Sequence, residues 1–301
     1  MKNLNVLSWF DKDTVKHLRL PFSLYLMPVF LFALSQADSI NWPATLLSFL
    51  ILHVLIFPSS NGYNSYQDRD ETSIGGLKYP PKVSRNLFYV TLLFDIAGVL
   101  SGLIISTTFS LFLVVLIIMS RAYSYRSVRL KKYPVIGFLT VFAFQGAFVY
   151  MTASSAITNN YLETYATSQN LICMCMASLF IGSMYPLTQI YQHDSDMKDG
   201  VTSLSYALGY SGTFAFSAAL FAAGTVLLFL LFNSRQHPIA FVIFLAMMLP
   251  VIVRLIYWTN KVHHDTIHAN FENTMKMNTL VSTCMNLYFL LLIFNRFGKW
   301  F

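Results

Sequence analysis

The chain has 301 residues, of which 55% are hydrophobic and only 11% are charged. Soluble globular domains carry about 25% charged residues, and the mean hydropathy of this chain is +0.55. The composition therefore excludes a soluble domain and predicts an all-α integral membrane protein, with a single membrane-embedded domain over residues 1–301. The net charge of +7 does not indicate a nucleic-acid partner, because the basic residues have a role in orienting the chain in the membrane.

The first segment, 1–17, has no continuous apolar run and no small-residue cleavage site. We therefore expect no removable signal peptide, and instead an amphipathic segment that lies at the membrane interface. The three cysteines, Cys173, Cys175 and Cys284, all fall in apolar runs. They are expected to be small buried hydrophobic side chains, not redox or metal-binding groups.

About nine apolar runs are long enough to cross a bilayer, which takes about 20 residues per helix. The third and fourth are separated by very little polar sequence, at 105–107. The expected spans are 18–37, 42–58, 87–105, 107–123, 135–153, 170–190, 211–232, 238–258 and 277–295.

With nine spans, 17 of the 20 Lys and Arg residues fall on one side of the membrane, and only Arg235, Arg296 and Lys299 fall on the other. Short loops rich in Lys and Arg face the cytoplasm. The N-terminus is therefore predicted to be cytoplasmic, together with the loops that follow the second, fourth, sixth and eighth spans.

Six of the 13 acidic residues gather in two of these loops. The clusters are 68–71, after the second span, and 194–199, after the sixth. This spacing predicts two helical halves, each with one acidic loop, that close around a common cavity. The alternative is a pair of ordinary solvated loops, in which Asp, Asn, Ser and Gly are common.

Each cluster is preceded by amides at helical spacing. Asn61, Asn64 and Asp68 stand at i, i+3 and i+7, and would share a face if the second span continued as a helix. Gln189, Gln192 and Asp196 repeat the same spacing.

Carboxylate and amide oxygens suit Mg²⁺, which proteins hold with one or two carboxylates together with waters and substrate phosphates. Basic residues close by in the sequence could neutralise a diphosphate. The predicted metal ligands are Asp68, Asn64, Asp196, Gln192, Asp70 and Asp194. The predicted diphosphate-binding residues are Asn61, Asn64, Lys82, Arg85, Arg129, Lys131, Gln192 and Lys198.

Three local motifs resemble the UbiA superfamily of intramembrane prenyltransferases. The second loop reads Asp-Met-Lys-Asp-Gly-Val-Thr-Ser-Leu from Asp196, with a Leu-Gly pair at 208–209. Tyr-Ser at 123–124, followed by Arg-Leu-Lys from Arg129, is similar to a family segment after the fourth helix. The first loop matches the family pattern Asn-Asp-x-x-Asp-x-x-x-Asp at Asp68.

The chain departs from the family pattern where the pattern has acids. Ser60 stands for the pattern's Asn, while Asn61 and Asn64 stand for its first two Asp residues, and Gln192 stands for the first Asp of the second loop. An amide offers a carbonyl oxygen to a metal but no negative charge. We therefore expect weaker metal binding unless Asp70, Glu71 or Asp194 compensates.

The resemblance implies nine helices around a central cavity and Mg²⁺-dependent transfer of a prenyl group from an isoprenyl diphosphate. The acceptor would be small, either an aromatic or quinone precursor or another nucleophile, and Asp68 and Asp196 would be catalytic. A close alternative is a membrane terpene cyclase that uses no acceptor. A third is a cation-coupled transporter, which would need more charges or broken helices at mid-membrane.

Two further features remain open from the sequence. Asp95, about eight residues into the third span, is a candidate for orienting or deprotonating the acceptor, or else a hydrogen-bonded structural acid. His264, His268 and Glu272 have a spacing that could hold Zn²⁺ on a helix, but they also fit the polar face of an interfacial helix. The same segment is a candidate lid for the cavity mouth.

Overall fold

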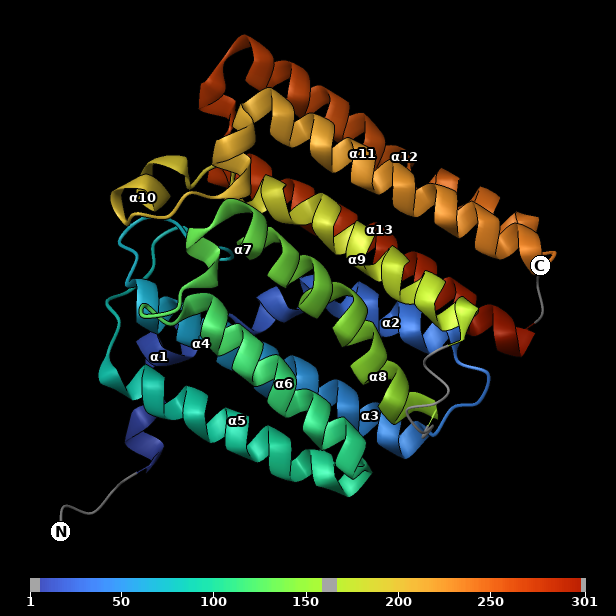
Figure 1. Cartoon of the computed structure of the whole chain (residues 1–301), viewed down its shortest axis with the longest axis horizontal. Coiled ribbons are helices and arrows are strands. Elements are labelled where there is room, and N and C mark those ends of the chain that lie inside the picture. Colours follow the sequence, from blue (N-terminus) through green and yellow to red (C-terminus); the bar gives the residue numbers. More distant parts are fainter. Residues whose placement is uncertain (1–5, 159–166, 299–301) are drawn as a thin grey trace.

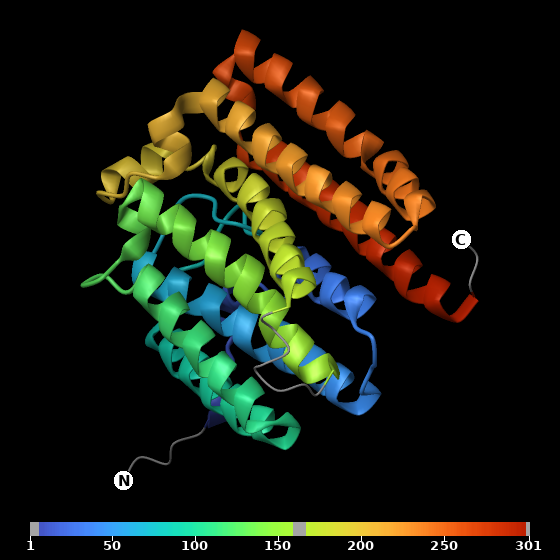
Figure 2. The same ribbon diagram turned by 45° about the vertical axis from the view of Figure 1, so that its right-hand side comes forward.

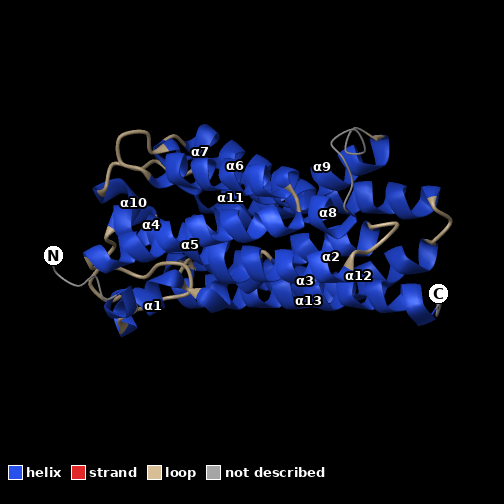
Figure 3. Cartoon of the chain, turned by 90° about the horizontal axis from the view of Figure 1, so that it is seen from below, coloured by secondary structure: helices blue, strands red, loops and turns tan. Residues whose placement is uncertain are grey.

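A computed structural model of the chain describes residues 6–158 and 167–298, in which every regular element is helical. Figure 3 shows the long helices running along a common axis. Within the described ranges the only β-type pairing is one isolated bridge between Ile74 and Leu77. The predicted all-α architecture is confirmed.

Two long helices each contain a π-helical segment and are therefore named in parts. The α-helices are α1 Lys12–Leu18, α2 Met27–Gln36, α3 Trp42–Leu50, α4 Phe57–Asp68, α5 Arg85–Ile105, α6 Thr107–Ser124, α7 Pro134–Val141, α8 Val149–Thr158, α9 Ser168–Gln189, α10 His193–Lys198, α11 Leu204–Ser234, α12 Pro238–His264 and α13 Phe271–Gly298. The π-helical segments are η3 Ile51–Ile56, between α3 and α4, and η5 Phe142–Phe148, between α7 and α8. Short 3-10 turns are η1 Val6–Trp9, η2 Leu20–Tyr25, η4 Leu130–Lys132 and η7 Thr266–His268.

The described part of the chain holds eight helices that are long and apolar enough to cross a membrane, and a ninth candidate span is the bent pair Lys12–Tyr25 and Met27–Gln36. The predicted span 18–37 corresponds to this bent pair. The two parts meet at 40°, and a proline stands at the start of both η2 and α2. Proline lacks the N–H that a continuous helix needs, so the span breaks there.

The π-helical segments also have local causes. Pro58 follows η3 and cannot donate to a carbonyl one turn back, so the turn before it widens. In η5, Gly146 lies so close to α9 that a Cβ would come 2.3 Å from Ser178 Cα. The backbone N–H of Ala147 donates to Ser178 Oγ at 3.0 Å instead of staying in the helical ladder. A side chain inserted into the ladder distorts a helix in this way.

The division between the third and fourth spans is confirmed at Ser106. Its backbone is extended, and its hydroxyl accepts a hydrogen bond from Phe109 N–H at 3.0 Å as an N-cap of α6. Helices α11, α12 and α13 run beyond the expected spans 211–232, 238–258 and 277–295 because their polar ends remain helical.

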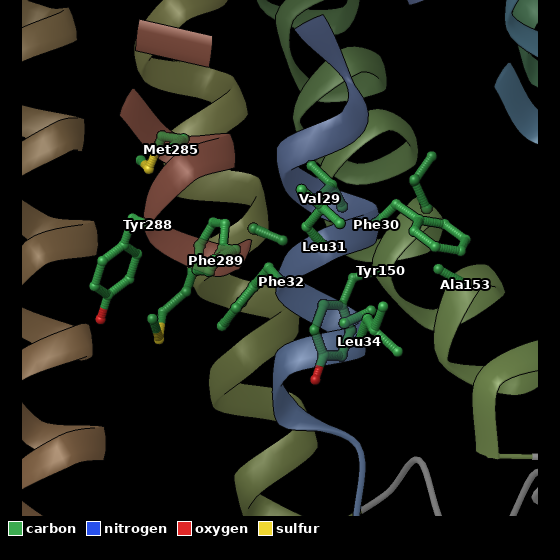
Figure 4. Close-up of a cluster of buried hydrophobic side chains, with 14 of the residues drawn as sticks. Val29, Phe30, Leu31, Phe32, Leu34, Tyr150, Ala153, Met285, Tyr288 and Phe289 are labelled. Atoms are coloured by element: carbon green, nitrogen blue, oxygen red, sulfur yellow. The ribbon is translucent and has the colours of Figure 1, made fainter. Parts of the chain in front are cut away.

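The core surrounds α2 (Figure 4). Six consecutive residues, 29–34, are all buried, so α2 is apolar on every side, as expected of a helix enclosed by others. Phe32 stacks on Phe289 of α13 at 5.1 Å and lies against Tyr150 of α8 at 5.2 Å. These contacts hold α13 and α8 on opposite sides of α2.

Both acidic clusters lie at one end of the bundle, where segments connect the helices. Figures 1 and 2 show α1, α10 and the ends of α4, α6 and α9 gathered there. Helix α1 is not purely a surface element, because His17 and Leu18 are buried against its neighbours. Residues 1–5 of the expected interfacial segment lie outside the described residues.

The cysteines differ from one another in exposure. Cys173 is buried as expected, Cys284 is half-buried and Cys175 is exposed. The expectation of burial is therefore wrong for Cys175. It stands two residues after Cys173, on the opposite face of α9, and an apolar run in a membrane helix includes residues on its outer face.

Candidate active site

A cavity of about 340 Å³ runs from the α10 end into the bundle. On α9 its wall extends from Ala177 to Gln189, which is about 18 Å at 1.5 Å per residue. The deep part is apolar and includes Phe32, Val149 and Phe289. The part near the α10 end contains Asp68 and Asp196. Both predicted clusters therefore contribute to one cavity.

The first cluster begins on a continuous helix, as the sequence spacing predicted. Asn61, Asn64 and Asp68 all lie on α4 and all line the cavity. Asn64 Nδ2 donates to Asp68 Oδ2 at 2.8 Å and to Ser124 Oγ at 3.2 Å. The amide thus orients the carboxylate beside it.

Asp68 is buried and bound by two cations from the segment after α6. Lys131 Nζ contacts its Oδ2, and Arg129 Nη2 lies 3.3 Å from its Oδ1. Arg129 also pairs with the carboxylate of Asp199 and donates to the Asp199 backbone carbonyl at 3.0 Å. One guanidinium therefore joins the two acidic clusters.

The second cluster is built differently from the expected continuous stripe. Helix α9 ends at Gln189, and Gln192 is the N-cap of the separate short helix α10, with a φ of −103° and a ψ of 2°. This break overturns the expected shared helical face of Gln189, Gln192 and Asp196. All three nevertheless line the cavity, because the turn redirects α10 across its end.

Asp196 makes no ion pair within the described ranges. Burial raises the pKa of its carboxyl to about 7, the nearby Lys131 ammonium opposes the rise, and the Asp70 and Asp68 carboxylates add to it. Burial and the Asp68 charge also raise the pKa of Asp70. The cavity mouth therefore holds carboxyl groups that are costly to ionise without an added cation.

His193 fastens α10 to α11. Its Nε2 lies 2.8 Å from Ser205 Oγ, which in turn lies 3.0 Å from Thr213 Oγ1. The His193 ring stacks on Tyr210 at 5.0 Å. Ser205 and Thr213 lie before and after Gly209 in the chain. Gly209 has a φ of 66°, which interrupts the helical path of α11, and glycine adopts this conformation without strain.

Four predicted site residues lie outside the cavity wall and are exposed. Lys82 and Arg85 belong to the segment before α5 and its first turn, and Arg85 lies over the Tyr89 ring at 5.7 Å. Asp194 and Lys198 are on the outer side of α10. The structure therefore does not bring these four together with Asp68 and Asp196, because the segments holding them present them to the outside.

Asp95 lines the cavity, but its carboxylate already has hydrogen-bonding partners within the protein. Arg121 of α6 bonds its Oδ2 through two nitrogens, and Ser59 Oγ donates to its Oδ1 at 2.6 Å. The Arg121 guanidinium also lies 3.8 Å over the Tyr63 ring. Asp95 is thus not a lone mid-membrane charge, and this geometry corresponds to the structural alternative, in which the acid ties α4, α5 and α6 together.

The segment with His264, His268 and Glu272 is divided among three elements. His264 ends α12, His268 is in η7 and Glu272 is in the first turn of α13. Within the described residues no group of three or more His, Cys, Asp or Glu side chains is arranged to hold a metal. The carboxylate of Glu272 instead pairs with Lys78 of the α4–α5 connection.

Sequence reasoning missed several polar residues of the cavity. Asp199 belongs to the second acidic cluster, and its position there is a signal that the sequence alone contains. Tyr185 lies 2.5 Å from Tyr123, hydroxyl to hydroxyl, and accepts from Gln189 Nε2 at 2.9 Å. Arg19 lines the cavity from the α1–η2 junction, yet in the sequence it was only one of many basic residues near a membrane interface.

The acids at the mouth are hard oxygen donors, although no three of them form a metal-binding group in the described part of the chain. Asp68, Asp70, Asp196 and Asp199 all line the cavity, and oxygen ligands of this kind suit Mg²⁺. Because the acids do not form a closed protein cage, such an ion would be held by one or two of them together with oxygens of a bound phosphate.

Solved structures with the same fold cover nearly the whole chain. A UbiA homolog from Archaeoglobus fulgidus bound to DMAPP and Mg²⁺ is 15% identical with a TM-score of 0.66, over 94% of this chain and 99% of that one. The apo UbiA homolog from Aeropyrum pernix K1 is 16% identical with a TM-score of 0.66, over 92% and 98%. A digeranylgeranylglyceryl phosphate synthase is 18% identical with a TM-score of 0.59, over 94% and 96%.

At these identities the likeness shows the fold. No protein of curated function matches the chain. The model of the UbiA prenyltransferase family matches residues 25–280, which include both acidic clusters and most of the cavity wall. The chain therefore belongs to the UbiA prenyltransferase family.

Proposed function

We propose that this protein transfers a prenyl group from an isoprenyl diphosphate to a small acceptor within the membrane, in a Mg²⁺-dependent reaction. The observation that carries the proposal is the cavity itself, which is apolar in its depth and has four carboxylates and Lys131 at its mouth. A prenyl diphosphate has the same polarity along its length. Its chain would occupy the apolar part and its diphosphate the charged end.

The ion pairs at the mouth would rearrange when substrate binds. Lys131 and Arg129 now neutralise Asp68 and Asp199. If the carboxylates turned to a cation, the ammonium and guanidinium would be released toward the diphosphate, which Arg binds in a bidentate manner. Bound Mg²⁺ would add electrostatic stabilisation of the negative charge that develops on the leaving diphosphate.

The bond that breaks is the allylic C–O bond, and its electron pair stays on the diphosphate oxygen. The acceptor then forms a bond to the allylic carbon and loses a proton. Aromatic faces stabilise the intermediate positive charge without reacting with it, and the wall supplies Tyr123, Phe144, Phe180, Tyr185 and Phe221. Because Asp95 is paired with Arg121, we do not propose Asp95 as the base that removes the proton from the acceptor.

The position of the site in the membrane follows from charge. We infer that the α10 end and the N-terminus face the cytoplasm, because segments 69–84 and 125–133, which are rich in Lys and Arg, connect helices at this end and short basic loops stay in the cytoplasm.

The test uses the full chain in detergent with geranyl, farnesyl and geranylgeranyl diphosphates, in Mg²⁺ or in EDTA. We expect Mg²⁺-dependent release of diphosphate with at least one of them, and a prenylated product when an acceptor panel is added. No release under any condition would contradict the proposal.

Product analysis separates the two chemistries open to this site. Release that requires an acceptor, with a prenylated product, is expected of a transferase. Release that is equally fast without an acceptor, with a cyclic hydrocarbon or alcohol as product, would identify a terpene cyclase instead.

A further inference from the structure

Helix α12 changes in character at Arg254. The 16 residues before it, 238–253, have no charged side chain, whereas Arg254 is followed by Lys261 two turns later. Arg254 lies about 24 Å from the start of the helix at 1.5 Å per residue, and the hydrocarbon core of a bilayer is about 30 Å thick. Arg254 therefore stands near the edge of the hydrocarbon, and the last turns of α12 reach the headgroup region.

This part of α12 lies at the α10 end of the bundle but outside the cavity. At the start of α13, which follows α12, Glu272 pairs with Lys78 and Phe271 packs on Tyr191 at 5.4 Å. Figure 2 shows α12, in orange-red, at the outer edge of the bundle. No residue of α12 belongs to the cavity wall, so its charges are not part of the candidate active site.

Arg254 has no acid partner in the described part of the chain. Its Nη2 donates to Oδ1 of Asn273 on α13 at 2.7 Å, which is a neutral acceptor. Its Nε is buried and has no hydrogen-bond partner among residues 6–158 and 167–298. The salt bridges of these residues do not include Arg254. A charge at this depth without an anion is costly, and it is a candidate functional group by default.

Tyr257 brings a second cation to the same place. Arg254, Tyr257 and Lys261 stand at i, i+3 and i+7 and share one face of α12. The Arg254 guanidinium lies 5.6 Å and the Lys261 ammonium 4.8 Å from the centre of the Tyr257 ring. The two charges are therefore no more than about 10 Å apart, comparable with the screening length of salt. We call these three side chains the α12 patch.

The acids of the α12–α13 connection do not neutralise the α12 patch. Asp265 accepts a hydrogen bond from Ile267 N–H at 2.9 Å, and Glu272 pairs with Lys78. The charges that act on the Tyr257 hydroxyl are those of Lys261 and Arg254, without a carboxylate among them. The α12 patch is thus complementary to an anion.

An apolar strip continues from the α12 patch toward the middle of the membrane. Leu249, Val253 and Ile256 are each more than half exposed, and their spacing of i, i+4 and i+7 places them on one face. A soluble anion would cover the patch and leave this strip bare. A molecule with an anionic group and aliphatic chains covers both, and in a membrane that molecule is a phospholipid.

We propose that the α12 patch binds the headgroup phosphate of an anionic phospholipid in the leaflet at the α10 end. Arg254 and Lys261 contact the phosphate oxygens, which suit a guanidinium, and the Tyr257 hydroxyl donates to the headgroup. The acyl chains lie along the strip of Leu249 and Val253. A zwitterionic headgroup fits less well, because its ammonium adds a third positive charge. The inference is independent of the proposed function, since α12 does not line the cavity.

The test measures lipid binding to the full chain in detergent by native mass spectrometry. The probes are dioleoylphosphatidylglycerol, dioleoylphosphatidylcholine with the same acyl chains, and glycerol 3-phosphate as a competitor without chains. Dissociation constants for the first bound lipid are measured for the wild type, Arg254→Gln, Arg254→Lys and Lys261→Gln. The control is Lys16→Gln, which removes one exposed cation from α1, a helix that packs on α4 and α5.

We expect the wild type to bind the phosphatidylglycerol about 10- to 100-fold more tightly than the phosphatidylcholine, the size of a charged hydrogen bond. Arg254→Gln reduces this preference to less than about threefold, and Arg254→Lys retains part of it. Lys261→Gln lowers it about fivefold, the contribution of one basic residue at a headgroup. Lys16→Gln changes it less than about twofold, and glycerol 3-phosphate displaces little lipid.

Lys261→Gln keeps the test decisive if Arg254→Gln fails to fold. Arg254 joins α12 to α13 through Asn273, whereas Lys261 lies against Tyr257 of its own helix. Lys261→Gln therefore removes a cation and leaves the bond between the helices intact.

Four results would overturn the inference. One is a wild type that binds both lipids equally well. Another is an unchanged preference in Lys261→Gln or in a folded Arg254→Gln variant, which would leave Arg254 as a tie between α12 and α13. A loss in Lys16→Gln as large as in Lys261→Gln would show an effect of net charge alone. Displacement of the lipid by glycerol 3-phosphate at matched concentration would identify a site for a soluble anion.

Discussion

Asp68 and Asp196, one from each acidic cluster, are carboxylates of the cavity wall in opposite states. Asp68 ends a continuous membrane helix and is neutralised by Arg129, Lys131 and the amide of Asn64. Asp196 stands on the short separate helix α10 without an ion pair in the described structure, and burial raises its pKa to about 7. Asp68 is thus neutralised before any ligand binds, whereas we expect Asp196 to be stabilised as a carboxylate only when a cation arrives.

Each cluster also divides into inward and outward acids. Asp70 lines the cavity while Glu71 is exposed, and Asp196 and Asp199 line it while Asp194 is exposed. Amides stand where the resemblance places three acids of the family pattern, and Asp70 and Asp199 are the carboxylates placed to compensate.

The largest expected effect is on turnover. Asp196→Asn and Asp68→Asn should each lower the rate of Mg²⁺-dependent diphosphate release by about 10²–10³-fold or more, the cost of removing one main electrostatic group at a reacting centre. Steady-state release with the best prenyl diphosphate measures this. Retention of more than about a tenth of the wild-type rate in either variant would remove that carboxylate from the mechanism.

The two variants should differ in stability. Asp68→Asn leaves the half-buried Lys131 without its carboxylate and the buried Arg129 with Asp199 alone, and breaking a buried pair in this way costs about 3–5 kcal/mol. Asp196→Asn removes a carboxyl that burial already disfavours, so its thermal midpoint should equal or exceed that of the wild type at pH 8. Thermal unfolding in detergent without Mg²⁺ gives both midpoints, and equal losses would contradict the contrast.

The pH dependence should follow Asp196. Its folded pKa of about 7 is above the ordinary value of 3.8. The folded state therefore binds a proton that the unfolded state lacks between these values, and this contribution to stability is lost as the pH rises toward 7. Because Mg²⁺ needs the ionised form, its apparent affinity should fall about tenfold per pH unit below 7.

Mg²⁺ titrations followed by thermal shift at pH 6, 7 and 8 check this dependence. Asp196→Asn, which has no titrating carboxyl at this position, is the matched control and should flatten the profile. A wild-type Mg²⁺ affinity that is constant from pH 6 to 8 would show that Asp196 is not a ligand.

The smallest expected effect is on the apparent KM, and it distinguishes an acid that lines the cavity from an acid that is exposed. Asp199→Asn removes the partner of Arg129 and an oxygen of the mouth, and should raise the apparent KM for prenyl diphosphate about tenfold, as loss of one charged hydrogen bond does. Asp194→Asn, on the outer side of α10, should stay within about twofold of the wild type. Equal effects of the two substitutions on KM would contradict the orientation of α10.

Most of the fold was predictable because its signal is local. A long apolar run predicts a membrane span, and the short loops between spans carry the charged residues. The number of spans, the division at 105–107 and the position of both acidic clusters at one end of the bundle could therefore be predicted from the sequence. The bend in the first span was harder to predict, because it depends on how the surrounding structure accommodates the N–H that Pro28 lacks.

The candidate site was predictable only in part. Spacing placed Asn61, Asn64 and Asp68 on one face because they belong to one helix. The same spacing was misleading at Gln189, Gln192 and Asp196, where the helix breaks before α10. Neither Arg121, which binds Asp95, nor Arg19 could be assigned a partner from sequence, because their contacts join segments far apart in the chain.

The sequence by itself determined that this is a multi-pass membrane protein with acidic segments at one end of the bundle, because hydrophobicity and charge act through local composition. Only the tertiary structure decided which acids face the cavity, which cations neutralise them and which cations are left unpaired. Those outcomes depend on burial and on distances of a few ångströms between helices, and local composition specifies neither.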